Sequence, residues 1–349
     1  MYDFLGFLEI SSYSSDWSRH ISGSDPCQWD GVSCSENGGG DVVELHFAGF
    51  EFSNSILQSI YKLPALQVLD LYDTLLAGEI PQVFTQCTNL ISINLTLNHL
   101  TGPIPGSIGN LANLETLSLT SNVLFGSIPL QLSYMKDLQF LDLSDNQLTG
   151  SIPPQLFSLS NLMTLDLTSI SLSGGMPQIF SRNLIRVSIG NNRLNGTIPS
   201  TVSNAPNLAY LEMNNNHLIG PIPEQLGNCR ELQWLDLGNN KSRGPLINVL
   251  PKLLQLKYLK LTNNMFEGTI LDELSILSSL NYIDLSGNLL SGNLPSKIFK
   301  LNRLQHLWLQ NNLLTGTIPQ NIQDAVSLLE LRLERNNLTG TIPPGIGML

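Results

Sequence analysis

Hydrophobic positions along this chain recur with a fixed period. From Val42 onward, leucine or another hydrophobic residue fills the first, fourth and sixth positions of a unit that follows the template L-x-x-L-x-L-x-x-N-x-L-x-G-x-I-P. Eleven of the twelve spacings are 24 residues, and the spacing from Leu162 to Leu184 is 22. This regularity predicts stacked structural repeats with one continuous core. The thirteen units begin at Val42, Leu66, Leu90, Leu114, Leu138, Leu162, Leu184, Leu208, Leu232, Leu256, Leu280, Leu304 and Leu328.

Each position of the unit has a physical role. In the L-x-L segment, alternation places the leucines inside and the intervening residue outside, which predicts a short strand that pairs in parallel with its neighbours. The ninth position is asparagine in ten of thirteen units, and an inward amide can satisfy backbone groups at the turn that follows each strand. Glycine fills the thirteenth position in twelve units, where a side chain would block a tight bend. The exceptions at the ninth position are Phe50, Thr74 and Ile170.

The repeats divide the chain into two expected regions. We expect residues 1–41 to form an N-terminal cap with paired cysteines, and residues 42–349 to form the repeat array. The thirteenth repeat stops at Leu349 without a cap, which would expose the core of that repeat and predicts a fragment. The two residues missing from the sixth repeat predict a local change in the stacking of its neighbours.

The four cysteines fall into two pairs. Cys27 and Cys34 enclose six residues, and a disulfide closing that loop would contribute roughly 2.5 kcal/mol in the chain-entropy model. Such a bond implies an oxidising compartment. Cys87 and Cys229 each lie three residues before the first leucine of a repeat, six repeats apart. At about 4.8 Å per strand they lie too far apart for a disulfide, so we expect two buried free thiols.

Composition and charge exclude several classes of partner. Hydrophobic residues make up 42% and charged residues 13% of the chain, which is ample material for a long core. The net charge is -11, with 17 Lys and Arg against 28 Asp and Glu, so no nucleic-acid partner is expected. No apolar stretch is long enough to span a bilayer, and the first ten residues lack the basic residues of a signal peptide.

Three segments resemble a known family. Leu148-Thr-Gly-Ser-Ile-Pro153 and Leu338-Thr-Gly-Thr-Ile-Pro343 are similar to the L-x-G-x-I-P signature of plant-specific leucine-rich repeats. Residues 25–34, with their two cysteines, resemble the N-terminal cap of the ectodomains of plant leucine-rich-repeat receptor-like kinases. The resemblance implies an α/β solenoid: a right-handed superhelix with a concave parallel β-sheet and short 3-10 or α turns on the convex side.

No catalytic constellation is visible, and we expect neither a cofactor nor a metal ion. The five histidines are scattered along the array, and the motifs of zinc proteases, phosphate loops, serine hydrolases and kinases are absent. The chain is therefore not expected to be an enzyme, although the resemblance implies that a full-length parent carries a Ser/Thr protein kinase domain.

The candidate ligand-binding residues lie at outward strand positions of repeats seven to twelve. The third position is aromatic or histidine in five consecutive repeats, a column about 19 Å long that matches an extended peptide of about six residues. The alternative is that these side chains merely pack along the sheet. Trp308, one outward position further, widens the patch and favours binding. The candidates are Arg186, Tyr210, Trp234, Tyr258, Tyr282, His306 and Trp308.

Charged outward positions give weaker indications. Arg186 lies where peptide-hormone receptors of the resembling family carry an Arg-x-Arg pair for a carboxylate, but the second arginine is here Ser188. One arginine can still bind a carboxylate bidentately. Acidic residues recur at the fifth position and would favour a basic partner. The interpretation that they simply keep the strands soluble is the stronger one. They are Asp70, Asp142, Asp166, Glu212, Asp236 and Asp284.

Four N-x-[ST] sequons occur. Asn240 is a ninth-position residue whose amide should point inward, so we expect it to be bare. Asn94, Asn195 and Asn337 are expected to carry glycans, with Asn94 on the concave face.

These observations predict the extracellular ectodomain of a plant plasma-membrane receptor-like kinase that acts in signal perception, with a peptide as the expected ligand. Its expected partners are a small peptide or protein ligand and a co-receptor ectodomain, with membrane attachment only through a segment beyond Leu349. Two alternatives stay open. The chain could be a soluble apoplastic inhibitor of a cell-wall hydrolase, or a receptor-like protein without a kinase.

Overall fold

The computed structural model describes residues 25–36, 40–50, 55–246 and 249–348. The chain divides into two compact units, Met1–Leu172 (unit 1) and Ser173–Leu349 (unit 2). The division falls inside the 22-residue sixth repeat. The change in stacking expected there stays a prediction.

In unit 1, one short strand from each repeat joins a sheet. β1 (Val32–Cys34) pairs antiparallel with β2, and the strands from β2 onward run parallel in chain order. The surface made by their outward side chains is called the strand face below. The strands after β1 are β2 (Val42–His46), β3 (Val68–Asp70), β5 (Ser92–Asn94), β7 (Thr116–Ser118), β9 (Phe140–Asp142) and β11 (Thr164–Asp166).

Unit 2 repeats this arrangement with seven parallel strands, which also form a strand face. Equivalent residues of successive repeats are directly paired, as Tyr210 with Trp234 and Trp234 with Tyr258. The strands are β13 (Arg186–Ser188), β15 (Tyr210–Glu212), β17 (Trp234–Asp236), β19 (Tyr258–Lys260), β21 (Tyr282–Asp284), β23 (His306–Trp308) and β25 (Glu330–Arg332).

A second strand follows the first in most repeats and contributes to lateral sheets. In unit 1 these strands are β4 (Ala77–Glu79), β6 (His99–Thr101), β8 (Phe125–Ser127) and β10 (Gln147–Gly150). β12 (Ser171–Gly175) spans the division between the units. In unit 2 they are β14 (Arg193–Gly196), β16 (His217–Gly220), β18 (Lys241–Pro245), β20 (Met265–Thr269), β22 (Leu289–Asn293) and β24 (Leu313–Thr315).

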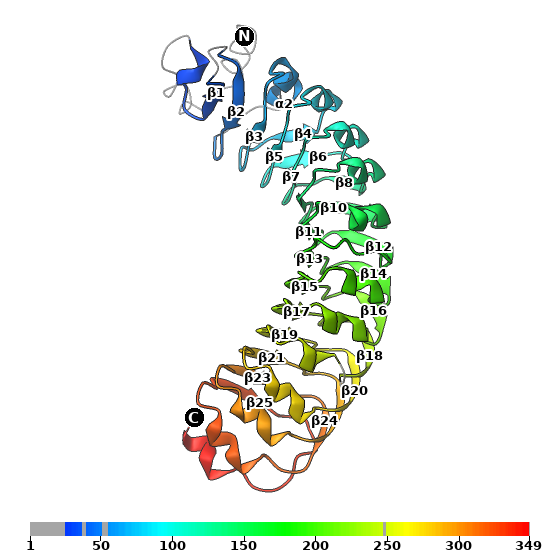
Figure 1. Cartoon of the computed structure of the whole chain (residues 1–349), viewed down its shortest axis with the longest axis vertical. Helices are drawn as coiled ribbons and strands as arrows, with labels where there is room; N and C mark the ends of the chain where they lie inside the picture. Colours follow the sequence, from blue (N-terminus) through cyan, green and yellow to red (C-terminus); the bar gives the residue numbers. More distant parts are fainter. Residues whose placement is uncertain (1–24, 37–39, 51–54, 247–248, 349) are drawn as a thin grey trace. The chain divides into compact units, whose positions relative to one another are not determined.

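Short helices form the side opposite the strand face in most repeats, as Figure 1 shows for unit 1, whereas the described residues of the sixth repeat contain no helix. Apart from α2 (Ser55–Ser59), they are 3-10 helices, several of which begin directly after the proline of the repeat. They are Pro26–Gln28, Ile60–Lys62, Gln82–Gln86, Gly106–Asn110, Leu130–Tyr134 and Pro154–Ser158 in unit 1. In unit 2 they are Ser200–Asn204, Glu224–Asn228, Leu250–Lys252, Asp272–Ile276, Ser296–Lys300, Gln320–Asp324 and Pro344–Met348.

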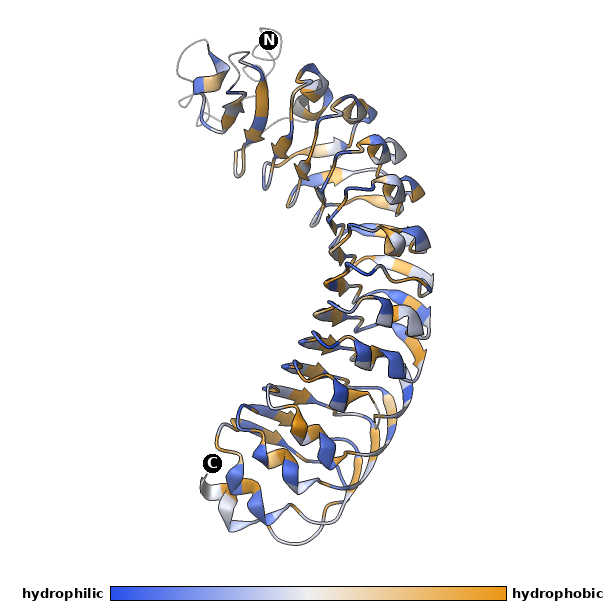
Figure 2. Cartoon of the chain, in the orientation of Figure 1, coloured by the Kyte–Doolittle hydropathy of each residue, from blue (hydrophilic) through white to orange (hydrophobic). Residues whose placement is uncertain are grey.

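The core consists of the repeated leucines, and hydrophobic residues recur in the strands of both units (Figure 2). Within each unit, ninth-position asparagines join neighbouring repeats. The Asn264 side-chain amide donates to the carbonyls of Leu237, Leu261 and Thr262, and its oxygen accepts from the Ser242 N–H at 3.0 Å. The predicted asparagine ladder is confirmed. The predicted fold class is likewise confirmed as stacked leucine-rich repeats with parallel strands and 3-10 turns.

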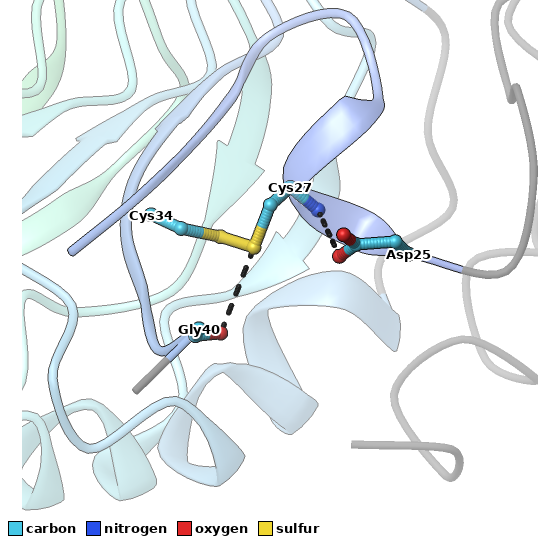
Figure 3. The surroundings of a disulfide bond; sticks show 4 residues. All are labelled: Asp25, Cys27, Cys34 and Gly40. Atoms are coloured by element: carbon cyan, nitrogen blue, oxygen red, sulfur yellow. Dashed lines mark hydrogen bonds between the residues drawn. A yellow bond between two sulfur atoms is a disulfide. The ribbon is translucent and has the colours of Figure 1, made fainter. Parts of the chain in front are cut away.

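A disulfide bond lies near the start of the described part of the chain. Cys27 and Cys34 form a disulfide, with their Cα atoms 5.5 Å apart (Figure 3), which confirms the predicted bond. The Asp25 carboxylate accepts a hydrogen bond from the Cys27 N–H at 3.1 Å. Gly31 has a φ of 81°, and a Cβ atom there would lie 2.2 Å from the His46 carbonyl oxygen, so only glycine allows this approach to β2.

Cys87 and Cys229 are buried free thiols, as predicted. Each sulfur lies 3.4 Å from a backbone carbonyl oxygen of the preceding repeat, Ile60 for Cys87 and Val202 for Cys229. Burial raises the pKa of both thiols to about 11, so both stay protonated and unreactive near neutral pH.

Candidate ligand-binding face

The candidate aromatic residues form one column on the strand face of unit 2. Tyr210, Trp234, Tyr258, Tyr282 and His306 are the first residues of β15, β17, β19, β21 and β23, and each is paired in register with the next. Trp308 is the next outward residue of β23. The structure thus brings together six of the seven predicted ligand-binding residues, and Arg186 begins the neighbouring strand β13.

Three rings in the middle of this column, those of Trp234, Tyr258 and Tyr282, stack on one another. The centroids of Trp234 and Tyr258 are 3.6 Å apart with planes 4° apart, and Tyr258 stacks on Tyr282 at 4.4 Å and 9°. At the end of the stack, Tyr282 meets Trp308 edge to face at 5.3 Å and lies 5.6 Å from His306. The strand spacing suits stacking because neighbouring strands lie about 4.8 Å apart.

Stacking changes what the column presents to a ligand. We expected exposed rings, but all six side chains are half-buried, and from Trp234 to Trp308 each ring contacts a neighbouring ring. Burial raises the pKa of the Tyr258 hydroxyl, and raises that of Tyr282 to about 12, so both hydroxyls stay protonated as hydrogen-bond donors. The column therefore presents ring edges and polar tips.

Arg186 is already engaged within the protein. Its guanidinium lies 3.2 Å from the Glu212 carboxylate, and its Nε donates to the Ser188 hydroxyl at 3.1 Å. Ser188 in turn donates to Glu212 at 2.8 Å, and the guanidinium lies 5.5 Å from the centroid of the Tyr210 ring. The sequence interpretation missed this arrangement, although Ser188 and Glu212 occupy equivalent positions of adjacent repeats. Binding a ligand carboxylate here would compete with Glu212.

A similar arrangement lies at the other end of the column. Arg332 donates to Glu330 at 2.6 Å and lies 4.5 Å over the Trp308 ring. His306 Nδ1 is 3.4 Å from the same carboxylate. The hydrogen bond from Arg332 is the largest cause of the lowered pKa of Glu330. Both ends of the aromatic column thus carry an arginine that is paired with a glutamate.

The acidic residues at the fifth position have a structural role. Asp284 accepts from the Ser286 N–H at 3.0 Å, and Asp142 accepts from the Ser144 N–H at the same distance. Each therefore holds the turn after its own strand. Burial is the largest cause of the raised pKa of both carboxyls. This geometry favours a local structural role over a surface for a basic partner.

The sequons differ in the availability of their amides. The Asn240 side chain is buried and donates to three backbone carbonyls, so its nitrogen has no room for a glycan. Asn195 and Asn337 are exposed. Asn94 lies on the strand face of unit 1, and its amide donates to Asp70 at 2.9 Å. Glycosylation of Asn94, Asn195 and Asn337 stays a prediction.

Within the described ranges, no group of three or more His, Cys, Asp or Glu side chains could hold a metal ion. The helices of the described part of the chain are too short or too polar to cross a membrane.

Family models identify the repeats. A leucine rich repeat model matches residues 64–124 and 182–241, and a second one matches residues 137–159, 279–301, 303–325 and 327–349. Together they cover more than half of the chain. The chain belongs to the leucine-rich-repeat family. A leucine rich repeat N-terminal domain model also matches residues 3–35.

Within the leucine-rich-repeat family, the chain is similar to plant receptors. Phytosulfokine receptor 1 of Arabidopsis thaliana is 29% identical over 99 residues, which are 28% of this chain and 10% of that receptor. The plant peptide hormone receptor RGFR1, solved in complex with RGF2, matches with a TM-score of 0.78 and 30% identity over 92% of this chain and 58% of that chain. The Arabidopsis receptor kinase HAESA was solved with the peptide hormone IDA and the co-receptor SERK1. It matches with a TM-score of 0.68 and 25% identity, over 99% of this chain and 75% of the HAESA chain.

These similarities support a leucine-rich-repeat ectodomain of the plant receptor-kinase type. The matches indicate no enzymatic domain in this array. The chain spans only part of its relatives, as little as a tenth of the phytosulfokine receptor and little more than half of the RGFR1 chain.

Proposed function

We propose that this chain is the peptide-binding part of an extracellular plant receptor, and that the peptide lies along the strand face of unit 2. The continuous aromatic column from Tyr210 to Trp308 carries the proposal, because it gives one extended face of large, half-buried rings. The similar RGFR1 and HAESA structures contain peptide hormones, which supports a peptide as the ligand class.

The wider proposal concerns signalling. A peptide on the strand face would recruit a co-receptor ectodomain, and the signal would pass to a kinase domain of the full-length receptor. The HAESA complex, which contains a co-receptor, supports this arrangement. The location that follows is the extracellular face of the plasma membrane.

A double substitution in the aromatic column tests the proposed peptide site. Peptides selected from a displayed random library against the wild-type chain would be titrated by calorimetry into the Trp234→Ala/Tyr258→Ala variant. We expect binding to weaken by about 2 kcal/mol or more, the scale of interface hot spots.

The matched control is Phe140→Ala, because Phe140 begins β9 in unit 1 just as Tyr258 begins β19 in unit 2. The control should leave peptide affinity unchanged, and circular dichroism would verify that both variants fold. Equal affinity of a folded double variant for every selected peptide would show that the column is only packing.

A further inference from the structure

The cations of the unit 2 strand face are all paired within the protein. Among the described strands that form this face (β13, β15, β17, β19, β21, β23 and β25), the lysines and arginines are Arg186, Lys260 and Arg332. Arg186 pairs with Glu212 at 3.2 Å, and Lys260 lies 3.6 Å from Asp236. Arg332 pairs with Glu330, as described above. A charged ligand side chain would therefore meet a face whose charges already compensate one another.

Two donors of the same face are without an acceptor in hydrogen-bonding geometry. The indole nitrogen of Trp234 is buried and has no hydrogen-bond partner among the described residues, and the same holds for the indole nitrogen of Trp308. Glu330 is close enough to Trp308 for that indole to contribute to its lowered pKa. Trp234 is the clearer case. Buried polar groups in native proteins are nearly always hydrogen-bonded, so these two N–H groups need an explanation.

Two carboxylates of the column are directed at other groups and do not accept from these indoles. Asp236 accepts from the Gly238 N–H at 2.9 Å and faces Lys260. Asp284 accepts from both the N–H and the hydroxyl of Ser286. The column thus has indole donors available, while the Asp236 and Asp284 carboxylates are engaged and the Tyr258 and Tyr282 hydroxyls interact with each other.

We infer that the aromatic column takes an uncharged, extended peptide segment whose carbonyl oxygens accept hydrogen bonds from the indoles of Trp234 and Trp308. The inference rests on the proposed peptide-binding function and narrows it. β17 and β23 are three strand spacings apart in the sheet, about 14 Å, which an extended segment of about four residues spans. Proline-containing segments suit this face best, because they present carbonyls but have few N–H groups that would need acceptors.

Binding also requires a side-chain movement. The Trp234 nitrogen is shielded from solvent, and one face of its ring lies flat on Tyr258 at 3.6 Å. A ligand carbonyl can reach this N–H only if a neighbouring side chain changes rotamer. Occupation of the site should therefore change the indole environment of Trp234 directly.

Three matched octapeptides test the inference, each acetylated and amidated so that the ends carry no charge. The first alternates alanine with proline, and the others replace alanine by lysine or by glutamate. At 0.15 M salt we expect the alanine peptide to bind at least tenfold more tightly than either charged peptide, the ratio that the loss of about one good hydrogen bond or pairing partner produces. The Trp234→Phe variant keeps an aromatic ring but lacks the N–H. This variant should bind the alanine peptide about tenfold more weakly than the wild-type chain does.

The control is Trp29→Phe, which makes the same exchange at a buried tryptophan in unit 1 and should leave affinity unchanged. A second measurement follows the indole ¹H–¹⁵N resonance of Trp234, assigned by its loss in Trp234→Phe. This resonance should move downfield when the alanine peptide is added, because the N–H gains an acceptor.

The outcomes separate this inference from the proposed function. One outcome is that library-selected peptides need Trp234 and Tyr258 for binding but place charged side chains against the aromatic column. This outcome would support the proposed function and overturn the inference. The inference also fails if the alanine peptide does not bind, or if it binds without moving the Trp234 resonance. If no peptide of any kind binds the strand face, the proposed function falls and the inference falls with it.

Discussion

The strand faces of the two units share one backbone and differ in their outward side chains. In unit 1 the third positions include three small hydroxyl-bearing residues and a single aromatic residue, Phe140. The hydroxyl-bearing residues are Ser92, Thr116 and Thr164. In unit 2 the same positions carry the stacked column with paired arginines at its ends. Because the buried leucines and the asparagine ladder are common to both units, the scaffold and the candidate site are encoded by separate positions of the repeat.

Charge separates the units as clearly as the aromatic residues do. Residues 1–172 contain 17 acidic and 3 basic residues, whereas residues 173–349 contain 11 acidic and 14 basic residues. The negative charge of the chain therefore belongs to unit 1. A negative field over unit 1 and near balance over unit 2 would steer an anionic partner away from the first unit.

Matched substitutions in the asparagine ladder should have the largest effect and should show that the scaffolds are equivalent. Asn122→Ala in unit 1 and Asn264→Ala in unit 2 each remove three donated bonds and one accepted bond. Because backbone carbonyls stay buried without partners, each variant should lose about 3 kcal/mol or more of unfolding free energy. Urea unfolding followed by circular dichroism measures this.

The surface substitution Gln147→Ala serves as the control for the ladder and should change stability little. A large difference between the two ladder variants would mean that the units do not share one mechanism of stabilisation.

Ring stacking should distinguish the units at a smaller scale. Tyr258→Ala removes two stacked contacts and should cost about 2 kcal/mol, whereas Phe140→Ala at the equivalent position of unit 1 should cost about 1 kcal/mol. Urea unfolding of the two variants measures the difference. If Phe140→Ala loses as much unfolding free energy as Tyr258→Ala, the expected difference between the units is wrong. The stacked column would then stabilise unit 2 no more than a single ring stabilises unit 1.

The smallest expected effect is a dependence on pH that both units share. Burial raises the pKa of Asp142 and of Asp284 above the ordinary value of 3.8, so the folded state holds protons more tightly than the unfolded state. The resulting stabilisation is full below pH 3.8 and is lost as the pH rises through the raised pKa. Asp142→Asn and Asp284→Asn remove this dependence while keeping an acceptor for the turn.

Each asparagine variant should therefore become more stable relative to wild type as the pH is raised from about 3.5 to 6.5, a window placed around the ordinary and raised pKa values. Urea midpoints at the two pH values measure the change. A change of opposite sign would show that burial does not dominate the environment of these carboxyls.

Much of this protein could be predicted from local sequence. The 24-residue period, the inward leucines, the ladder asparagines, the bend glycines and the Cys27–Cys34 bond are all visible in the sequence and confirmed in the structure. They are predictable because each repeat contacts its nearest neighbours. Equivalent positions therefore have the same surroundings in every repeat and require the same type of residue. The sequence also placed the aromatic residues in one column, because strand register follows directly from the period.

Only the tertiary structure decided how those outward side chains use one another. The sequence could not show that Glu212 and Ser188 engage Arg186, that the rings of Trp234 and Tyr258 lie flat against each other, or that the Trp234 N–H lacks an acceptor. These features depend on the rotamers of side chains that are 24 to 26 residues apart in sequence and a few ångströms apart in space. The period fixes which positions face outward, but the choice of partner among outward side chains is made by their packing in three dimensions.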